Sequence, residues 1–161
     1  MLRALIVGLC LLAQPAVAGQ LEDGRAALRS NDFATAMQLL RPLAEQGDAA
    51  AQASLASMYY LGLGVPQDYV ETLKWLRRAA AQGDASAQEV LGFMYSKGEG
   101  VPQDYVQAHM WFNLAAAGSS NAEVRAEALK NRISVAAFMT PDQIAEAQRL
   151  AQEWIAVHPK P

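Results

Sequence analysis

One segment of this sequence occurs twice. The letters GVPQDYV fill residues 64–70 and return at residues 100–106, a spacing of 36 residues. Other residues recur at the same spacing, namely Gly47-Asp48 and Gly83-Asp84, Leu55 and Leu91, Met58-Tyr59 and Met94-Tyr95, Trp75 and Trp111, and Ala79-Ala80 and Ala115-Ala116. A fixed period of this length is typical of stacked supersecondary units. Because such units bury their apolar faces against neighbours, we expect a row of similar units.

Each unit is predicted to hold two helices joined by a fixed turn. In the first full copy, apolar residues spaced by three and four predict one helix over residues 49–61 and another over residues 69–82. Gly62 and Gly64 can adopt the positive φ that ends a helix. Pro66 disfavours the helical conformation of the residue before it. The repeated letters therefore preserve a bend between two helices.

Capping residues follow the turn in both copies. Asp68 is predicted to cap the second helix, with Glu71 completing a capping box, and Asp104 with Gln107 has the same roles in the copy. Trp75 lies among small residues on the inner face of that helix. An aromatic side chain repeated at such a position is predicted to pack in the core rather than to line a ligand cage.

The chain departs from the period at both ends. The first unit, residues 21–46, lacks the long glycine turn and has Ser30-Asn31-Asp32 in its place. Two further helix starts are predicted near the C-terminus, Ser120 with Glu123 in one capping box and Thr140 with Gln143 in another, where Pro141 takes the first helical position. Such atypical terminal helices suit a cap on the stack.

These signals predict an all-α protein, an α/α solenoid of helical hairpins. A single domain is expected over residues 19–161, with repeats at residues 21–46, 47–82 and 83–118 and a C-terminal capping helix pair in residues 119–157.

The first eighteen residues have the pattern of a secretory signal peptide. Arg3 is followed by the apolar stretch Ala4–Ala13 and by a small-residue motif that predicts cleavage after Ala18. The apolar stretch is shorter than the roughly 20 residues of a membrane span. We therefore expect a periplasmic or secreted protein without membrane insertion of the mature chain. Lipidation of Cys10 is not expected, because the bulky Leu9 precedes it.

The repeat pattern resembles the Sel1-like repeat, a relative of the tetratricopeptide repeat. The residues that carry the resemblance are Ala51, Leu55, Ala56, Tyr59, Gly62, Gly64, Val65, Asp68, Thr72, Trp75, Ala79, Ala80 and Gly83, and in the copy Ala87, Leu91, Gly92, Tyr95, Gly98, Gly100, Val101, Asp104, Ala108, Trp111, Ala115 and Ala116. The resemblance implies a solenoid adaptor with a concave surface for a protein or peptide. In exported bacterial members it implies roles in envelope assembly, signalling or host contact.

Catalytic and cofactor chemistry finds little support in the sequence. Some secreted members of the family are linked to β-lactam hydrolysis, but they carry a cysteine pair in each repeat, and the one cysteine here is Cys10 in the predicted signal peptide. The two histidines, His109 and His158, lack neighbouring ligands and are expected at the surface, so no metal and no cofactor is predicted. The acids available to a cell-wall glycosidase, Glu71, Glu89 and Glu99, are more simply solvated or capping groups.

A protein–protein scaffold of the cell envelope, without catalysis, is therefore the predicted function. A peptidoglycan-associated or β-lactam-interacting hydrolase is the alternative, and a periplasmic regulator is a third possibility. Nucleic acid is not an expected partner, because the formal net charge is −3 and no basic run occurs.

The predicted binding residues are exposed positions of the first helices that differ between copies. They are Ser57, Tyr60 and Leu61 in one unit and Phe93, Ser96 and Lys97 in the next. A core must repeat if the units are to stack, whereas a binding face is free to vary. We expect these residues to form a groove for a peptide or helix of the partner, although neutral variation of a solvated face would give the same difference.

Overall fold

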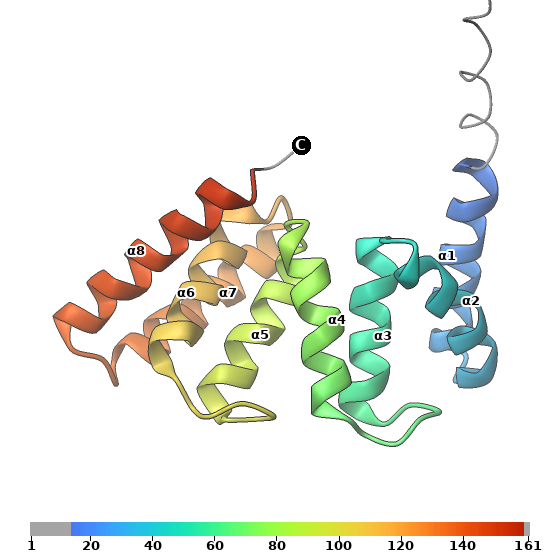
Figure 1. Cartoon of the computed structure of the whole chain (residues 1–161), viewed down its shortest axis with the longest axis horizontal. Coiled ribbons are helices and arrows are strands. Elements are labelled where there is room, and N and C mark those ends of the chain that lie inside the picture. The colour runs from blue at the N-terminus through green and yellow to red at the C-terminus, as the bar shows by residue number, and fades with distance from the viewer. Residues whose placement is uncertain (1–13, 160–161) are drawn as a thin grey trace, which may run out of the picture.

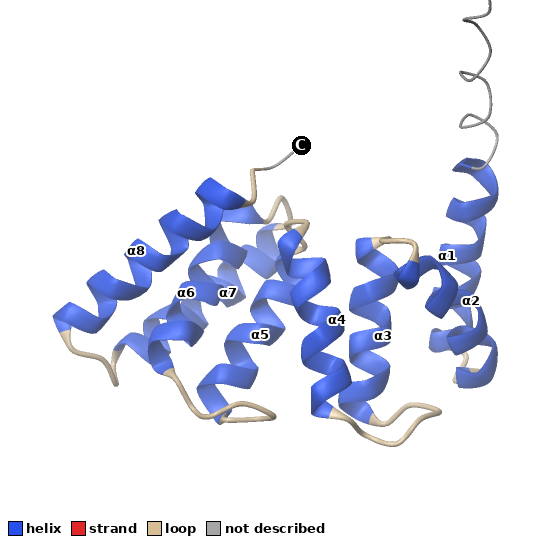
Figure 2. Ribbon diagram, in the orientation of Figure 1, coloured by secondary structure: helices blue, strands red, loops and turns tan. Residues whose placement is uncertain are grey.

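The computed structural model describes residues 14–159, and Figure 1 shows their helices in chain order. They are α1 (Gln14–Arg29), α2 (Phe33–Glu45), α3 (Ala49–Leu61), α4 (Tyr69–Ala81), α5 (Ala85–Lys97), α6 (Tyr105–Gly118), α7 (Ala122–Ala136) and α8 (Pro141–Val157). The described residues contain no strand (Figure 2), which confirms the all-α prediction. Residues 1–13 of the predicted signal peptide lie outside the described range, and the rest of it opens α1.

The helices stand side by side as antiparallel hairpins in a curved row (Figure 1). α1 pairs with α2, α3 with α4, and α5 with α6, and each hairpin also packs on the next one. At the end of the row, α7 packs on α5 and α6, and α8 packs on α6. The two terminal helices thus close the solenoid mainly by covering α6 rather than by packing on each other.

The repeated turn both ends a helix and touches the preceding hairpin. Gly62 ends α3 in the left-handed conformation, with φ of 68°. Gly64 and Gly100 also have positive φ, 71° and 70°. A Cβ atom at Gly64 would lie 2.5 Å from Cβ of Phe33, and one at Gly100 would lie 2.6 Å from Cβ of Tyr69. The second glycine of the turn therefore allows one hairpin to approach the one before it.

The predicted cap at Asp68 is present, but the predicted capping box is wrong. The Asp68 carboxylate accepts hydrogen bonds from the backbone N–H groups of Val70 and Glu71, at 2.8 and 3.0 Å. Its own backbone N–H donates to the carbonyl of Tyr59 at 3.0 Å, so this group is not available to Glu71. The Glu71 carboxylate instead accepts from Nε1 of Trp75 at 3.1 Å.

The second copy repeats this arrangement. Asp104 accepts from the backbone N–H of Gln107 at 3.0 Å, while its own N–H donates to the carbonyl of Tyr95 at 2.9 Å. The hydrogen bond expected between the Gln107 side chain and the backbone N–H of Asp104 is therefore replaced as well. In both copies, the aspartate ties the start of the second helix to the end of the first.

Of the two helix starts predicted near the C-terminus, one is displaced by a residue. Asn121, not Ser120, caps α7, and its side chain accepts from the backbone N–H groups of Glu123 and Val124. The Ser119 hydroxyl forms a short turn with the backbone of Asn121, which delays the helix start. At α8 the predicted capping box of Thr140 and Gln143 is present, with Pro141 in the first turn.

The core runs continuously through the hairpins, as the repeat predicts. Trp75 and Trp111 are both buried, 2% and 4% exposed, among leucine, methionine and alanine side chains of neighbouring helices. Their packing role is confirmed. The first unit turns at Asn31, where φ is 61°, as expected from the short Ser30-Asn31-Asp32 segment, and Asp32 also caps α2.

Candidate binding surface

The six predicted binding residues line two adjacent hollows. The first, the α3–α5 hollow, has a volume of about 250 Å³ and is lined by Ala56, Ser57, Tyr60, Leu61, Leu76, Val90, Phe93, Lys97 and Glu99. The second, the α5–α7 hollow, has a volume of about 360 Å³ and is lined by Phe93, Ser96, Lys97, Gln103, Tyr105, Phe112, Asn131, Ser134, Val135 and Phe138. Phe93 and Lys97 belong to both hollows, so the two form one surface across α3, α5 and α7.

Tyr60 links the α3–α5 hollow to the turn of the next unit. Its hydroxyl donates to Oε2 of Glu99 at 2.7 Å, and its ring is tilted against that of Tyr69 with a centroid distance of 5.7 Å. The hydrogen bond to Glu99, together with burial and the carboxylate charge, raises the pKa of Tyr60 to about 12. The end of α3 is thereby fixed relative to α5, which gives the hollow a preformed shape.

Phe93 forms the ridge between the hollows. It is 38% exposed and packs edge-on against Phe112, with ring centroids 5.4 Å apart. The ring of Phe112 fits because residue 92 is glycine, where a Cβ would lie 2.6 Å from the ring. The first copy has Ala56 and Leu76 at the equivalent positions. A smaller residue on α5 thus accompanies a larger one on α6.

The far wall of the α5–α7 hollow comes from residues that the sequence analysis did not single out. Phe138 is 70% exposed and stacks on Tyr105, with centroids 5.2 Å apart and planes 19° apart. Val135 is buried in a small cluster with Phe112. Val135 and Phe138 follow the last repeat and have no counterpart at the 36-residue spacing. The one available signal was an aromatic residue between two predicted helices.

Lys97 is the cation of this surface. It is exposed at the border of the two hollows and forms no ion pair within residues 14–159. The carboxylate that shares the α3–α5 hollow, Glu99, already accepts the hydrogen bond from Tyr60. The surface therefore offers exposed apolar groups, one cation without an ion pair among the described residues, and one carboxylate that accepts a hydrogen bond from Tyr60.

The histidines differ in their placement, and the expectation for His109 is wrong. His109 is 4% exposed, because the 36-residue spacing places it where the first copy has the core residue Leu73. Its Nδ1 atom has no hydrogen-bond partner in the structure. Burial lowers the pKa of His109, and the charge of Arg132 lowers it further. His158 is partly buried and stacks on Trp154, with centroids 3.8 Å apart.

The acidic side chains Glu89 and Glu127 form no catalytic cluster within these hollows. Burial raises the pKa of Glu89, the charge of Glu127 raises it further, and a hydrogen bond from Asn131 opposes the shift. Neither Glu89 nor Glu127 lines either hollow. Within residues 14–159, no group of three or more His, Cys, Asp or Glu side chains is placed to hold a metal ion. No helix in the same range is long and apolar enough to cross a membrane.

The stacked hairpins define an α/α solenoid. Sel1 repeats are matched at residues 17–48, 49–84 and 85–120, and the chain belongs to the Sel1 repeat family. Sel1 repeats usually mediate protein interactions, and the family generally consists of non-catalytic scaffolds. No protein of curated function matches this chain.

Two solved structures are similar to this chain. One is a protective antigen of uropathogenic Escherichia coli strains with an SLR fold, with a TM-score of 0.80 and 31% identity over 88% of this chain. This chain spans 30% of the length of that antigen. The other is a Sel1 repeat protein from Oxalobacter formigenes, with a TM-score of 0.60 and 36% identity, covering 71% of this chain and 88% of that one.

Proposed function

We propose that this protein is an exported, non-catalytic scaffold of the cell envelope that holds a segment of a partner protein across the α3–α5 and α5–α7 hollows. The observation that carries the proposal is the continuity of the two hollows through Phe93 and Lys97. A scaffold requires a preformed concave surface, since a rigid site loses less conformational entropy on binding than a mobile one.

The exposed apolar residues of this surface favour a protein partner. Leu61 is 61% exposed and Phe138 is 70% exposed, and they lie at opposite ends of the joined hollows, with Phe93 between them. Contiguous exposed apolar side chains rimmed by polar ones mark interaction sites. Burial of each Å² of apolar surface contributes about 25 cal/mol. A partner that covers all three side chains would gain most from the surface.

The chemistry of the partner follows from the charge at the centre of the surface. Lys97 lacks an ion pair within the described residues and stands between the two hollows. The matching segment has an apolar side chain for each hollow and a carboxylate between them. This pattern also explains why the binding face varies between copies, since each hollow receives a different side chain.

An affinity capture from envelope extract tests the proposal with matched surface variants. The double variant Tyr60→Ala with Phe93→Ala removes side chains from the surface, and Lys97→Glu reverses its charge. Val70→Ala with Val157→Ala removes apolar groups that are 72% and 70% exposed and lie outside the two hollows. We expect the first two variants to lose the partner and the control to retain it. Equal recovery by all folded variants would refute the binding surface.

The scaffold is favoured over the hydrolase because the carboxyl group with a raised pKa, Glu89, lies outside both hollows. The assay that separates the two functions is turnover of a chromogenic β-lactam or of a cell-wall fragment by the purified chain. The scaffold predicts no turnover above that of the buffer.

Export is part of the proposal and rests on the N-terminal pattern of Arg3, the apolar stretch and the small residues Ala16 and Ala18. Expression in a bacterial host, followed by intact-mass measurement of the periplasmic fraction, is expected to find a chain that begins at Gly19. An uncleaved chain confined to the cytoplasm would contradict export without touching the binding surface.

A further inference from the structure

A buried glutamine joins successive hairpins, and at the first junction all of its polar atoms are satisfied. Gln52 of α3 is 3% exposed, and its Nε2 donates to the carbonyl of Ala44 at 3.0 Å. Its Oε1 accepts from Nε2 of Gln82 at 3.0 Å. The same Nε2 of Gln82 donates to the carbonyl of Gly47 at 2.9 Å. One carboxamide group thus bridges two oxygen acceptors at this junction.

At the second junction the bridging carboxamide is missing. Gln88, 36 residues after Gln52, is 4% exposed, and its Nε2 donates to the carbonyl of Ala80 at 3.1 Å. Because that carbonyl can only accept, the orientation of the Gln88 amide is fixed. Its Oε1 has no hydrogen-bond partner in the structure. The position equivalent to Gln82 is Gly118, which has no side chain.

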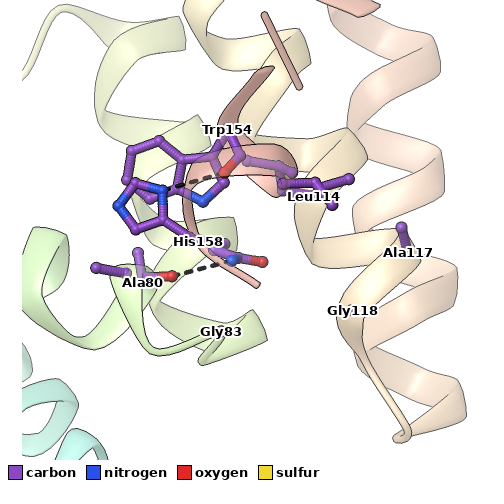
Figure 3. Close-up of a pocket in the computed structure, with 10 residues that line it drawn as sticks. Ala80, Gly83, Leu114, Ala117, Gly118, Trp154 and His158 are labelled. Carbon is purple, nitrogen blue, oxygen red and sulfur yellow. Dashed lines mark hydrogen bonds between the residues drawn. The ribbon is translucent and has the colours of Figure 1, made fainter. Parts of the chain in front are cut away.

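A hollow of about 140 Å³ opens where that side chain would lie, and we call it the α8 hollow (Figure 3). It is lined by Ala80, Ala81, Gly83, Gln88, Leu114, Ala117, Gly118, Trp154, Ile155 and His158. Gly83, the equivalent of Gly47, and Gln88 thus belong to the same wall. Trp154 and His158 stack with planes 16° apart, and Trp154 also packs edge-on against Trp111. The α8 hollow is therefore mostly apolar, with a buried oxygen acceptor in its wall.

We propose that the α8 hollow binds a primary carboxamide. The N–H groups of the ligand would donate to Oε1 of Gln88 and to the carbonyl of Gly83, as Gln82 donates to the equivalent groups of the first junction. Its methylene groups would pack on Leu114 and the ring of Trp154. A carboxylate is disfavoured, since its oxygens would face Oε1 of Gln88, which cannot donate a hydrogen bond. An ammonium group is disfavoured because no acid lines the hollow to compensate a buried charge.

The carboxamide has two sources, the side chain of a glutamine or asparagine in a partner and a free small amide. The site lies at the N-terminal end of α5, whereas Lys97 and the binding surface lie at its C-terminal end. The inference therefore does not depend on the proposed function. It adds a second, chemically distinct recognition point to the same solenoid.

Titration of the ¹⁵N-labelled full chain with propionamide tests the inference by NMR. The signals to follow are the side-chain amide of Gln88 and the indole N–H of Trp154. We expect saturable shifts with propionamide and none with propionate, which has the same shape without an N–H donor. N-acetylglutamine methylamide is the second probe. Tighter binding of this probe assigns the site to a glutamine side chain, and equal or weaker binding assigns it to a free amide.

Two variants separate recognition from mere contact. Gly118→Gln supplies the missing carboxamide from the chain itself, and Gln88→Met removes the acceptor while keeping the length of the side chain. Each is expected to weaken propionamide binding at least about tenfold, the effect of losing one hydrogen bond in a buried site. Circular dichroism verifies that each variant is folded, and either variant alone suffices for the test. Equal shifts with propionate, unchanged binding by the folded variants, or no saturable shift with either amide would overturn the inference.

Discussion

The two full copies of the repeat have the same backbone but different neighbours. In the first copy, Trp75 donates from Nε1 to Glu71, and Lys74 and Arg78 lie over its ring. In the second copy, Trp111 is packed against Trp154 of α8, and its Nε1 has no partner. The repeated residues thus specify how a hairpin bends and stacks. The departures from the repeat mark where the last hairpin meets helices that are not repeats.

The largest expected effect tests what the copies share. Gly64→Ala and Gly100→Ala each force a side chain into positive φ and against the preceding hairpin. The left-handed conformation costs about 1–2 kcal/mol for a non-glycine residue, and overpacking costs about 1–3 kcal/mol. We expect each variant to lose about 3 kcal/mol of unfolding free energy in urea denaturation. A loss of unfolding free energy in only one of the two variants would show that the two turns are not equivalent.

The next effect tests a difference between the copies. Gly92→Ala places a methyl group against the ring of Phe112, which is fully buried. We expect a loss of about 1 kcal/mol, because overpacking outweighs the gain in helix propensity. In a Phe112→Leu background, which restores the Ala56 and Leu76 pair of the first copy, the same change should stabilise by up to about 1 kcal/mol. A double-mutant cycle without coupling would contradict the compensation.

An effect of similar size concerns His109, which stands where the first copy has Leu73. Its pKa is lowered from 6.5 in the folded chain, so its contribution to stability is fully present above pH 6.5 and is lost as pH falls through the lowered value. His109→Leu should remove the loss of stability at acid pH that His109 causes. It should also raise the free energy of unfolding near pH 7 by about 1 kcal/mol, because it replaces a buried nitrogen that has no hydrogen-bond partner in the structure. The measurement is the free energy of unfolding of both proteins from pH 7 to 4. If it falls equally with pH in the two proteins, the lowered pKa of His109 is not the cause of the acid sensitivity.

The last effect concerns the hydrogen bond of Tyr60, whose equivalent in the second copy is Ser96. Tyr60→Phe keeps the ring but loses the bond to Glu99, at a cost of about 1 kcal/mol. Because the pKa of Tyr60 is raised from 10.0 to about 12, this contribution is present below pH 10 and is lost as pH rises toward 12. Alkaline denaturation should therefore be shallower in the variant. Parallel curves for both proteins would argue against the bond.

The features predicted correctly from the sequence are those that depend on neighbouring residues or on the spacing of the repeat. Asp68, Asp104 and Thr140 cap helices as expected, since capping depends on neighbouring residues. The capping box failed because the amide of Asp68 is bound by Tyr59, nine positions earlier in a folded-back turn. Local patterns do not contain that contact.

The candidate surface was predicted in part. The variable residues of α3 and α5 do line hollows, because the period placed them on one face. Phe138 was not foreseen, since its position depends on how α7 packs on the last repeat. The burial of His109 could have been predicted by aligning it with Leu73, and Gly118 could likewise have been aligned with Gln82.

The central claim is that partner binding resides on the variable face of α3, α5 and α7. A photo-reactive phenylalanine analogue at position 93, compared with the same group at position 70, tests it in intact cells. The account predicts one discrete adduct from position 93, which Lys97→Glu abolishes, and no such adduct from position 70. The same adducts from both positions, or an adduct at position 93 that survives Lys97→Glu, would contradict it.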